Sequence, residues 1–160
     1  MNKTKLKTSL FIVSSFLIPA IMMFFIYLSQ GIYWNSDTSP LLGDGYHQYV
    51  IFDTTLRNIL HGTDSLFYSF QSGLGINFYA LSSYYLGSFF SPLVYFFNAQ
   101  SMPDAVYLIT LLKFGAIGLS TYISLHGMFS KIPRSLVLTL STSFALMSFA
   151  ISQIEIGRAS

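Results

Sequence analysis

The chain has 160 residues, of which 52% are hydrophobic and 9% are charged, and its formal net charge is +2. Soluble globular domains carry roughly 25% charged residues, so this composition is typical of a polytopic membrane protein instead. The absence of cysteine from the sequence excludes disulfides and thiolate metal sites. Basic residues do not cluster among aromatic ones, so we expect no nucleic-acid partner.

The first predicted element, residues 1–30, is a basic N-terminus followed by a membrane helix. Three lysines come first, and the run from about Ser9 to Gln30 carries no charge. A membrane-crossing helix needs roughly 20 apolar residues, whereas the apolar part of a cleavable signal peptide has roughly 7–15. We therefore predict an uncleaved signal anchor whose N-terminus lies in the cytoplasm, because basic residues favour that side.

Residues 31–75 are the most polar part of the chain, and we predict that they form a long first external loop. Apolar residues recur within them at helical spacing, at Tyr49, Phe52, Leu56, Ile59 and Leu60. This pattern predicts an amphipathic helix over about 45–61, which ends at Gly62. Such a helix can lie in the membrane interface with its apolar face toward the lipid.

The segment 76–98 is apolar enough to cross a membrane, but Gly87 and Pro92 interrupt it. If it crosses, the later loop that carries Lys131 and Arg134 lies outside the cell. If it remains on the outer surface, that loop lies inside. Because basic loops favour the cytoplasmic side, we predict a juxtamembrane or re-entrant segment that does not cross.

Two further apolar runs complete the predicted fold, which is all-α and multi-pass in the cell membrane. Residues 104–129 are the second predicted transmembrane helix, and residues 135–153 are the third. The last residues, 154–160, read as a truncated end. We expect the chain to be a fragment of a longer protein.

Three stretches carry a family resemblance: "GDGYHQYVIF", "SFQSGLGINFYALSSYYLGSFFSPLVYFF" and "LLKFGAIGLSTYISL". From about Trp34 to Met147 the chain resembles the N-terminal part of the YfhO family of bacterial membrane proteins. Proteins of that family resemble the GT-C class of glycosyltransferases. The resemblance thus implies a GT-C-like N-terminal portion, with interfacial or juxtamembrane helices in the first external loop.

The resemblance also implies an activity. GT-C enzymes move a sugar from a polyprenyl-phosphate carrier to an acceptor on the outer face of the membrane. In YfhO-like proteins the implied acceptor is a cell-wall polymer such as a teichoic acid, so membrane lipids, the lipid-linked sugar and that polymer are the expected partners. Family members are several times longer, so this chain by itself is expected to be inactive.

The implied catalytic residue is Asp44, the acidic residue of a G-D-x-x-x-Q-Y element, which we expect to act as the base. Asp44 also stands where the predicted helix needs an N-cap, a role that aspartate fills well, and the two roles can coexist. Gln48, one turn later on the same face, and the adjacent Tyr49 are expected to contact the substrate. A solvated helix face is the alternative for Gln48.

Two basic residues are candidates for binding the carrier's phosphate. Lys113 lies within the second predicted membrane helix, where ionisable residues are costly and point to function. The alternative is a lysine that extends to the interface. Arg57 is the weaker candidate, and its alternative is an exposed helix charge paired with Asp53 four residues earlier.

Other functions and a metal remain open in the sequence. The resemblance allows a divalent cation, for which Asp44, His47 and His61 are the conceivable ligands. The two histidines are roughly 21 Å apart along one helix, so they cannot share an ion. The metal ligands are therefore unknown. A non-catalytic membrane scaffold, an inactive remnant and a segment of a transporter are the alternatives to the glycosyltransferase.

Overall fold

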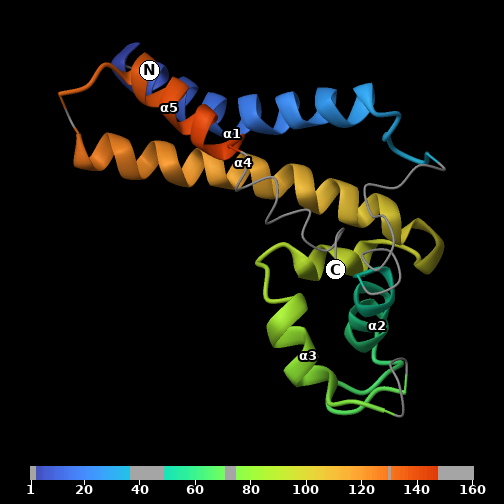
Figure 1. Cartoon of the computed structure of the whole chain (residues 1–160). Helices are drawn as coiled ribbons and strands as arrows, with labels where there is room; N and C mark the ends of the chain where they lie inside the picture. Colours follow the sequence, from blue (N-terminus) through green and yellow to red (C-terminus); the bar gives the residue numbers. More distant parts are fainter. Residues whose placement is uncertain (1–2, 37–48, 71–74, 130, 148–160) are drawn as a thin grey trace. The chain divides into compact units, whose positions relative to one another are not determined.

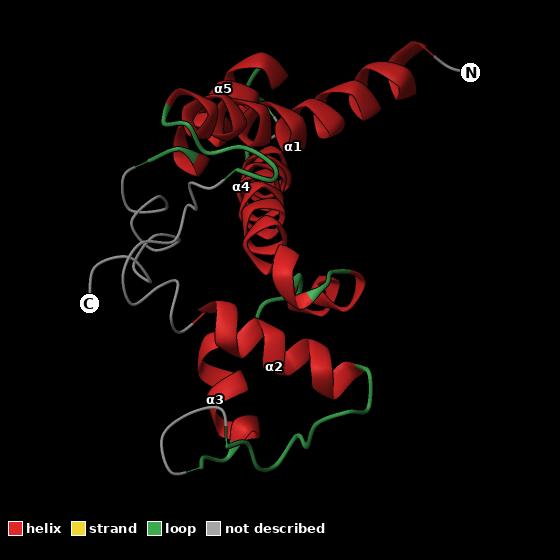
Figure 2. Ribbon diagram, turned by 90° about the vertical axis from the view of Figure 1, so that its right-hand side faces the viewer, coloured by secondary structure: helices red, strands yellow, loops and turns green. Residues whose placement is uncertain are grey.

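The computed structural model describes residues 3–36, 49–70, 75–129 and 131–147. Figures 1 and 2 show helices joined by loops, and within the described ranges the only β pairing is one isolated antiparallel bridge between Ser69 and Ile76. The all-helical expectation is therefore correct for this part of the chain. The fold divides into two units, which are described separately below.

Two helices are long and apolar enough to cross a membrane. α1 spans Lys3–Ser29 and α4 spans Met102–Met128, and the candidate spans are Lys7–Ser29 and Ala99–Met128. Each helix has 27 residues, or about 40 Å of length, which exceeds the roughly 30 Å hydrocarbon core of a bilayer. The two apolar runs read from the sequence thus form single helices.

The span unit, Met1–Gly31 with Thr110–Ile154, contains α1, most of α4 and α5. Its helices α1 and α4 approach closely at two glycines of α4. A Cβ atom at Gly118 would lie 2.4 Å from the Ser15 carbonyl oxygen and 2.6 Å from Pro19, and one at Gly115 would lie 2.9 Å from Phe16. Small residues allow such close approach between helices in membranes, where packing replaces the hydrophobic effect.

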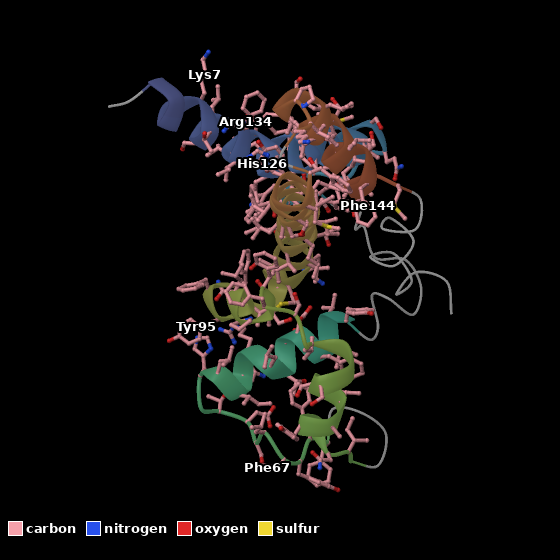
Figure 3. All side chains as sticks on the ribbon, turned by 90° about the vertical axis from the view of Figure 1, so that its left-hand side faces the viewer. Lys7, Phe67, Tyr95, His126, Arg134 and Phe144 are labelled. Atoms are coloured by element: carbon pink, nitrogen blue, oxygen red, sulfur yellow. The ribbon has the colours of Figure 1, made fainter. Side chains whose placement is uncertain are left out.

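The third helix of the span unit, α5, spans Arg134–Ala145 and packs against α1. Nη1 of Arg134 donates a hydrogen bond of 2.7 Å to Oγ1 of Thr8. This bond places the first turn of α5 beside the N-terminal part of α1, and Figure 3 shows Lys7 and Arg134 at the same end of this unit. This helix has 12 residues and ends at Ala145, so it is shorter than the third predicted span over 135–153. Residues 146 and 147 form a turn, and 148–153 lie outside the described residues.

The loop unit, which in its described part runs from Ile32 to Ile109, contains the shorter helices. α2 spans Ile51–Leu60, and one π turn at residues 49–50 precedes it. The backbone N–H of Gly62 donates to Ile59, and Gly62 has φ +75°, which ends the helix as expected. Of the expected helix over 45–61, residues 45–48 lie outside the described residues.

Residues 76–98 form two short helices in place of one long one. α3 spans Phe78–Tyr85, and its N-cap is Asn77, whose side chain accepts a hydrogen bond from the Ala80 amide at 3.4 Å. The 3-10 helices η2, Ser91–Phe96, and η3, Ala99–Ser101, follow before α4 begins. Eight residues of α-helix reach only about 12 Å, so α3 cannot span the hydrocarbon core.

Two small apolar clusters hold the loop unit together. One contains Phe52, Phe78 and Leu86, from α2, α3 and the residue after it. The other joins Val94 of η2 to the first turns of α4 through Met102, Ala105 and Ile109, with Val50 and Leu56 packed against it. Phe52 and Leu56 on the apolar face of α2 are thus covered by protein, whereas Leu60 on the same face is 42% exposed.

A hydrogen bond joins the beginning of the loop unit to the part of α4 at its end. The backbone N–H of Asn35 donates to Oδ1 of Asp104, 69 residues later, at 2.8 Å. Asp104 lies in the first turn of α4, where a carboxylate is favourable beside the helix N-terminus. Asn35 itself adopts φ +59°, a left-handed conformation that asparagine tolerates better than most residues.

Candidate functional site

The most informative candidate residue is Arg57, which lies in the last turn of α2. It is half-buried, and its Nε donates to the Phe97 carbonyl oxygen at 2.5 Å, while Nη1 donates to Oδ1 of Asn58 at 3.1 Å. Both acceptors are neutral oxygens. Arg57 is therefore not the exposed helix charge that the sequence offered as its alternative role.

Arg57 retains capacity for a further partner. A guanidinium carries five N–H groups, and within the described part of the chain its bonds to Phe97 and Asn58 use two of them, so three have no partner there. A planar guanidinium held at its Nε edge presents its remaining N–H groups in a fixed direction, and this geometry suits a phosphate or carboxylate. The tie to Phe97 thus orients the group without neutralising its charge.

His61 lies one turn after Arg57 on the same side of α2. Its Nδ1 lies 2.8 Å from the carbonyl oxygen of Arg57, and its ring stacks on Tyr95 of η2 with centroids 4.3 Å apart and planes 14° apart. A carbonyl oxygen only accepts, so Nδ1 carries a proton, and Nε2 of the neutral ring is an acceptor. The stack and the hydrogen bond together fix the direction in which the imidazole points.

Aromatic rings extend this cluster along η2. Trp34 and Phe97 lie with ring centroids 6.0 Å apart, and Tyr95 and Phe96 pack edge to face at 5.4 Å. Figure 3 shows Tyr95 at the side of the loop unit where η2 meets α2. The candidate site is therefore a cationic and aromatic cluster, consisting of Arg57, His61, Tyr95 and Phe97.

The buried side of α2 carries two polar residues that the helical pattern did not single out as buried. Asp53 is only 5% exposed and Thr55 only 1% exposed, although both are polar. Thr55 returns a hydrogen bond of 2.9 Å to the Ile51 carbonyl. Because burying a carboxylate is costly unless it is satisfied, Asp53 belongs to the interior of the loop unit and not to a solvated face.

The structure describes only some of the candidate residues from the sequence, and these lie in different units. Asp44 and Gln48 lie outside the described residues, as does His47. Tyr49 is half-buried in the π turn that leads into α2, so it belongs to the loop unit with Arg57. Lys113 is half-buried in α4 and belongs to the span unit.

Metal binding finds no support among the residues that the structure describes, because they contain no group of three or more histidine or acidic side chains able to hold an ion. His61, which the sequence raised only as a metal ligand, is instead fixed by Tyr95 and by its own helix. Its four-residue spacing from Arg57 was the signal in the sequence that could have joined the two residues.

Comparisons with known proteins agree with the membrane character of the chain. The family model described as bacterial membrane protein YfhO matches residues 14–157. The comparisons with curated proteins and with solved structures each gave no match. The matched range covers the described part of the loop unit and every candidate site residue named above.

Proposed function

Because this chain belongs to the YfhO family of bacterial membrane proteins, we propose that it is the N-terminal portion of a GT-C-type membrane glycosyltransferase. The enzyme would move a sugar from a polyprenyl-phosphate carrier to a polymer of the cell envelope, of the teichoic-acid type. The family membership and the resemblance of the three quoted stretches support this proposal.

The observation that carries the proposal is the oriented guanidinium of Arg57. Along the chain, the loop unit follows the candidate span Lys7–Ser29 and contains the start of the candidate span Ala99–Met128. It holds Arg57 by a hydrogen bond to Phe97, and three N–H groups of Arg57 have no partner among the described residues. A lipid-linked sugar carries a phosphate that must be held while the sugar leaves. Arginine is well suited to this task because its fork matches the oxygens of a phosphate.

In the proposed reaction, a hydroxyl oxygen of the acceptor attacks the anomeric carbon of the sugar. The bond between that carbon and the phosphate oxygen breaks, and the electron pair leaves with the polyprenyl phosphate. Asp44 takes the proton of the attacking hydroxyl, a contribution typically of about 10²–10⁴-fold in rate. Gln48 and Tyr49 contact the sugar, and Arg57 neutralises the leaving phosphate, a role for which Lys113 is the alternative candidate.

The proposed topology follows from the positions of the basic residues. Lys7 and Arg134 lie at one end of the span unit, and basic residues are enriched on the cytoplasmic side of membrane proteins. We therefore assign this end to the cytoplasm and residues 31–98 to the outer side, where the acceptor polymer lies. The third span over 135–153 is part of the same proposal.

The test compares two matched substitutions, Asp44→Asn and Asp64→Asn, in membranes from cells that produce the full protein. The substrate is a polyprenyl phosphate carrying a radiolabelled hexose, and the label is counted in the isolated cell-wall polymer. We expect Asp44→Asn to reduce transfer by about 10²-fold or more, because asparagine retains the capping oxygen but cannot take the proton. Asp64 accepts a hydrogen bond from the adjacent Ser65 amide, and its variant should retain transfer.

Equal transfer by both variants and by the wild type would remove Asp44 from the mechanism. If the wild-type protein itself transfers no label, the scaffold or transporter alternatives become the better account of the family member. The two outcomes are distinguishable, because the first leaves an active enzyme and the second does not.

A further inference from the structure

Two phenylalanines around η2 are unusually exposed. Phe89 is 93% exposed and Phe96 is 78% exposed, whereas Val94 between them is fully buried. Their neighbours Phe90, Leu93 and Phe97 pack against the cluster around Val94. The segment therefore has an inner side, which packs on the loop unit, and an outer side, which presents two large apolar rings.

The inner side of this segment packs directly on the beginning of a candidate membrane span. Val94 shares a cluster with Met102, Ala105 and Ile109, which are in the first turns of α4. The candidate span itself begins at Ala99, only three residues after Phe96. Three extended residues reach at most about 10 Å, so both the packing and the chain length hold η2 beside the start of the span.

The surrounding sequence is unusually free of charge. No Asp, Glu, Lys, Arg or His occurs between Asp64 and Asp104. Leaving a phenylalanine side chain in water instead of burying it forfeits roughly 1.5–3 kcal/mol, and Phe89 and Phe96 both do so if water surrounds them. Aromatic residues are by contrast favourable at the boundary between lipid and water.

We propose that Phe89 and Phe96 insert into the interfacial layer of the membrane that α4 crosses, and that η2 thereby anchors the loop unit to the lipid surface. The occupant of this apolar surface is lipid, because no charged residue lies between Asp64 and Asp104 and a candidate membrane span begins three residues after Phe96. This inference does not require the sugar-transfer activity proposed above.

The anchor has a consequence for the candidate site. The residue after Phe96 is Phe97, whose carbonyl oxygen accepts the hydrogen bond from Arg57. The ring of Phe96 is thus connected to the guanidinium of Arg57 through the backbone of Phe97 and one hydrogen bond. The anchor would hold Arg57 at the level of the lipid headgroups, where the phosphate of any lipid-carried substrate lies.

The test uses tryptophan fluorescence in the full protein reconstituted into phosphatidylethanolamine–phosphatidylglycerol vesicles. Trp34 is the only tryptophan in this sequence. In a Trp34→Phe background, the fluorescence of the chain therefore comes only from the tryptophan that is introduced. Phe96→Trp and Phe89→Trp probe the anchor. Phe67→Trp is the matched control, because Phe67 is 69% exposed but lies at the other end of the loop unit (Figure 3).

We expect lipids brominated on their acyl chains to remove roughly half or more of the emission from Trp at positions 96 and 89, as for an aromatic ring within the interfacial layer. The Trp at position 67 should instead be quenched by acrylamide added to the water. Acrylamide quenching at 96 and 89 equal to that at 67 would overturn the proposal, and so would equal bromolipid quenching at all three positions.

A third result would also overturn it. If neither quencher reaches positions 96 and 89, another protein surface covers these rings. Far-UV circular dichroism of each variant checks that the helices have formed before the quenching is measured. Where one variant fails this check, the other of the two, Phe89→Trp or Phe96→Trp, decides the test.

Discussion

Arg57 and Phe97 are 40 residues apart in the chain, yet Nε of the first lies 2.5 Å from the carbonyl oxygen of the second. The bond joins the last turn of α2 to the residue that follows η2. It gives a hydrogen-bond partner to the carbonyl oxygen of Phe97, which lies just after the end of η2, and it also orients the guanidinium. One side chain therefore serves both the fold of the loop unit and the proposed site.

Replacing Arg57 with lysine should destabilise the loop unit. The lysine retains the positive charge but loses the fork that contacts Phe97 and Asn58 together, and hydrogen bonds from charged groups contribute about 1.5–3 kcal/mol. Urea unfolding in detergent micelles, followed by the emission of Trp34, measures this loss, because Trp34 lies 6.0 Å from the ring of Phe97. Arg134→Lys, in the span unit, is the matched control and should leave the Trp34 transition in place; equal shifts for both variants would contradict the prediction.

Replacing Gly118 with alanine should weaken the packing of α1 on α4. The added methyl group would lie 2.4 Å from the Ser15 carbonyl oxygen, which is backbone and cannot rotate away. Overpacking of this kind typically costs about 1–3 kcal/mol. The midpoint of unfolding by dodecyl sulfate, followed by far-UV circular dichroism, should therefore fall.

The control for Gly118 is Gly127→Ala, in the same helix. A Cβ at Gly127 has no neighbour within 4 Å, and alanine is favoured over glycine in a helix by up to about 1 kcal/mol. This variant should be as stable as the wild type or more stable. A fall of the midpoint in Gly127→Ala that matches the one in Gly118→Ala would show that helix contact is not the cause.

Alanine should be tolerated worse at Gly75 than at Gly62. Both glycines have positive φ, +105° and +75° respectively, but a Cβ at Gly75 would also lie 2.1 Å from the hydroxyl oxygen of Tyr68. The left-handed conformation alone costs a residue with a side chain roughly 1–2 kcal/mol. We expect Gly62→Ala to show about this loss in the Trp34 unfolding assay and Gly75→Ala to show more, and the reverse order would be inconsistent with the structure.

Cysteine labelling checks the proposed topology, and the chain is a convenient background because it contains no cysteine. Ser65→Cys lies on an exposed loop after α2, and Lys131→Cys lies in the exposed turn before α5. A membrane-impermeant maleimide added to intact cells should label the first and not the second. Permeabilised cells provide the control, since both positions should then react, and labelling of both in intact cells would refute the assignment of sides.

The family and the two long helices could be read from the sequence. The resemblance found in "GDGYHQYVIF" and the stretches after it is confirmed by the match to the YfhO family over residues 14–157. Uninterrupted apolar runs are enough to predict α1 and α4, because a chain in lipid must satisfy its backbone hydrogen bonds within each helix. These features depend on local composition alone.

The environment of α2 was predicted only in part. The structure has this helix over Ile51–Leu60, and part of its apolar face packs on α3 and η2, whereas the sequence also allowed a face turned toward lipid. Asp53 is buried although it is acidic. The hydrophobic pattern of a helix shows that one face is covered, but it does not say whether lipid or protein covers it.

The two long apolar helices and the family membership could be predicted from sequence, because both depend on residues that are neighbours along the chain. Only the tertiary structure decided that Arg57 binds the Phe97 carbonyl, that His61 stacks on Tyr95, and that Phe89 and Phe96 face outward while Val94 faces inward. The physical reason is that these relationships join segments about 30 to 40 residues apart or depend on the packing around a 3-10 helix. Such long-range contacts follow from the side-chain packing of the whole unit, and local periodicity does not encode them.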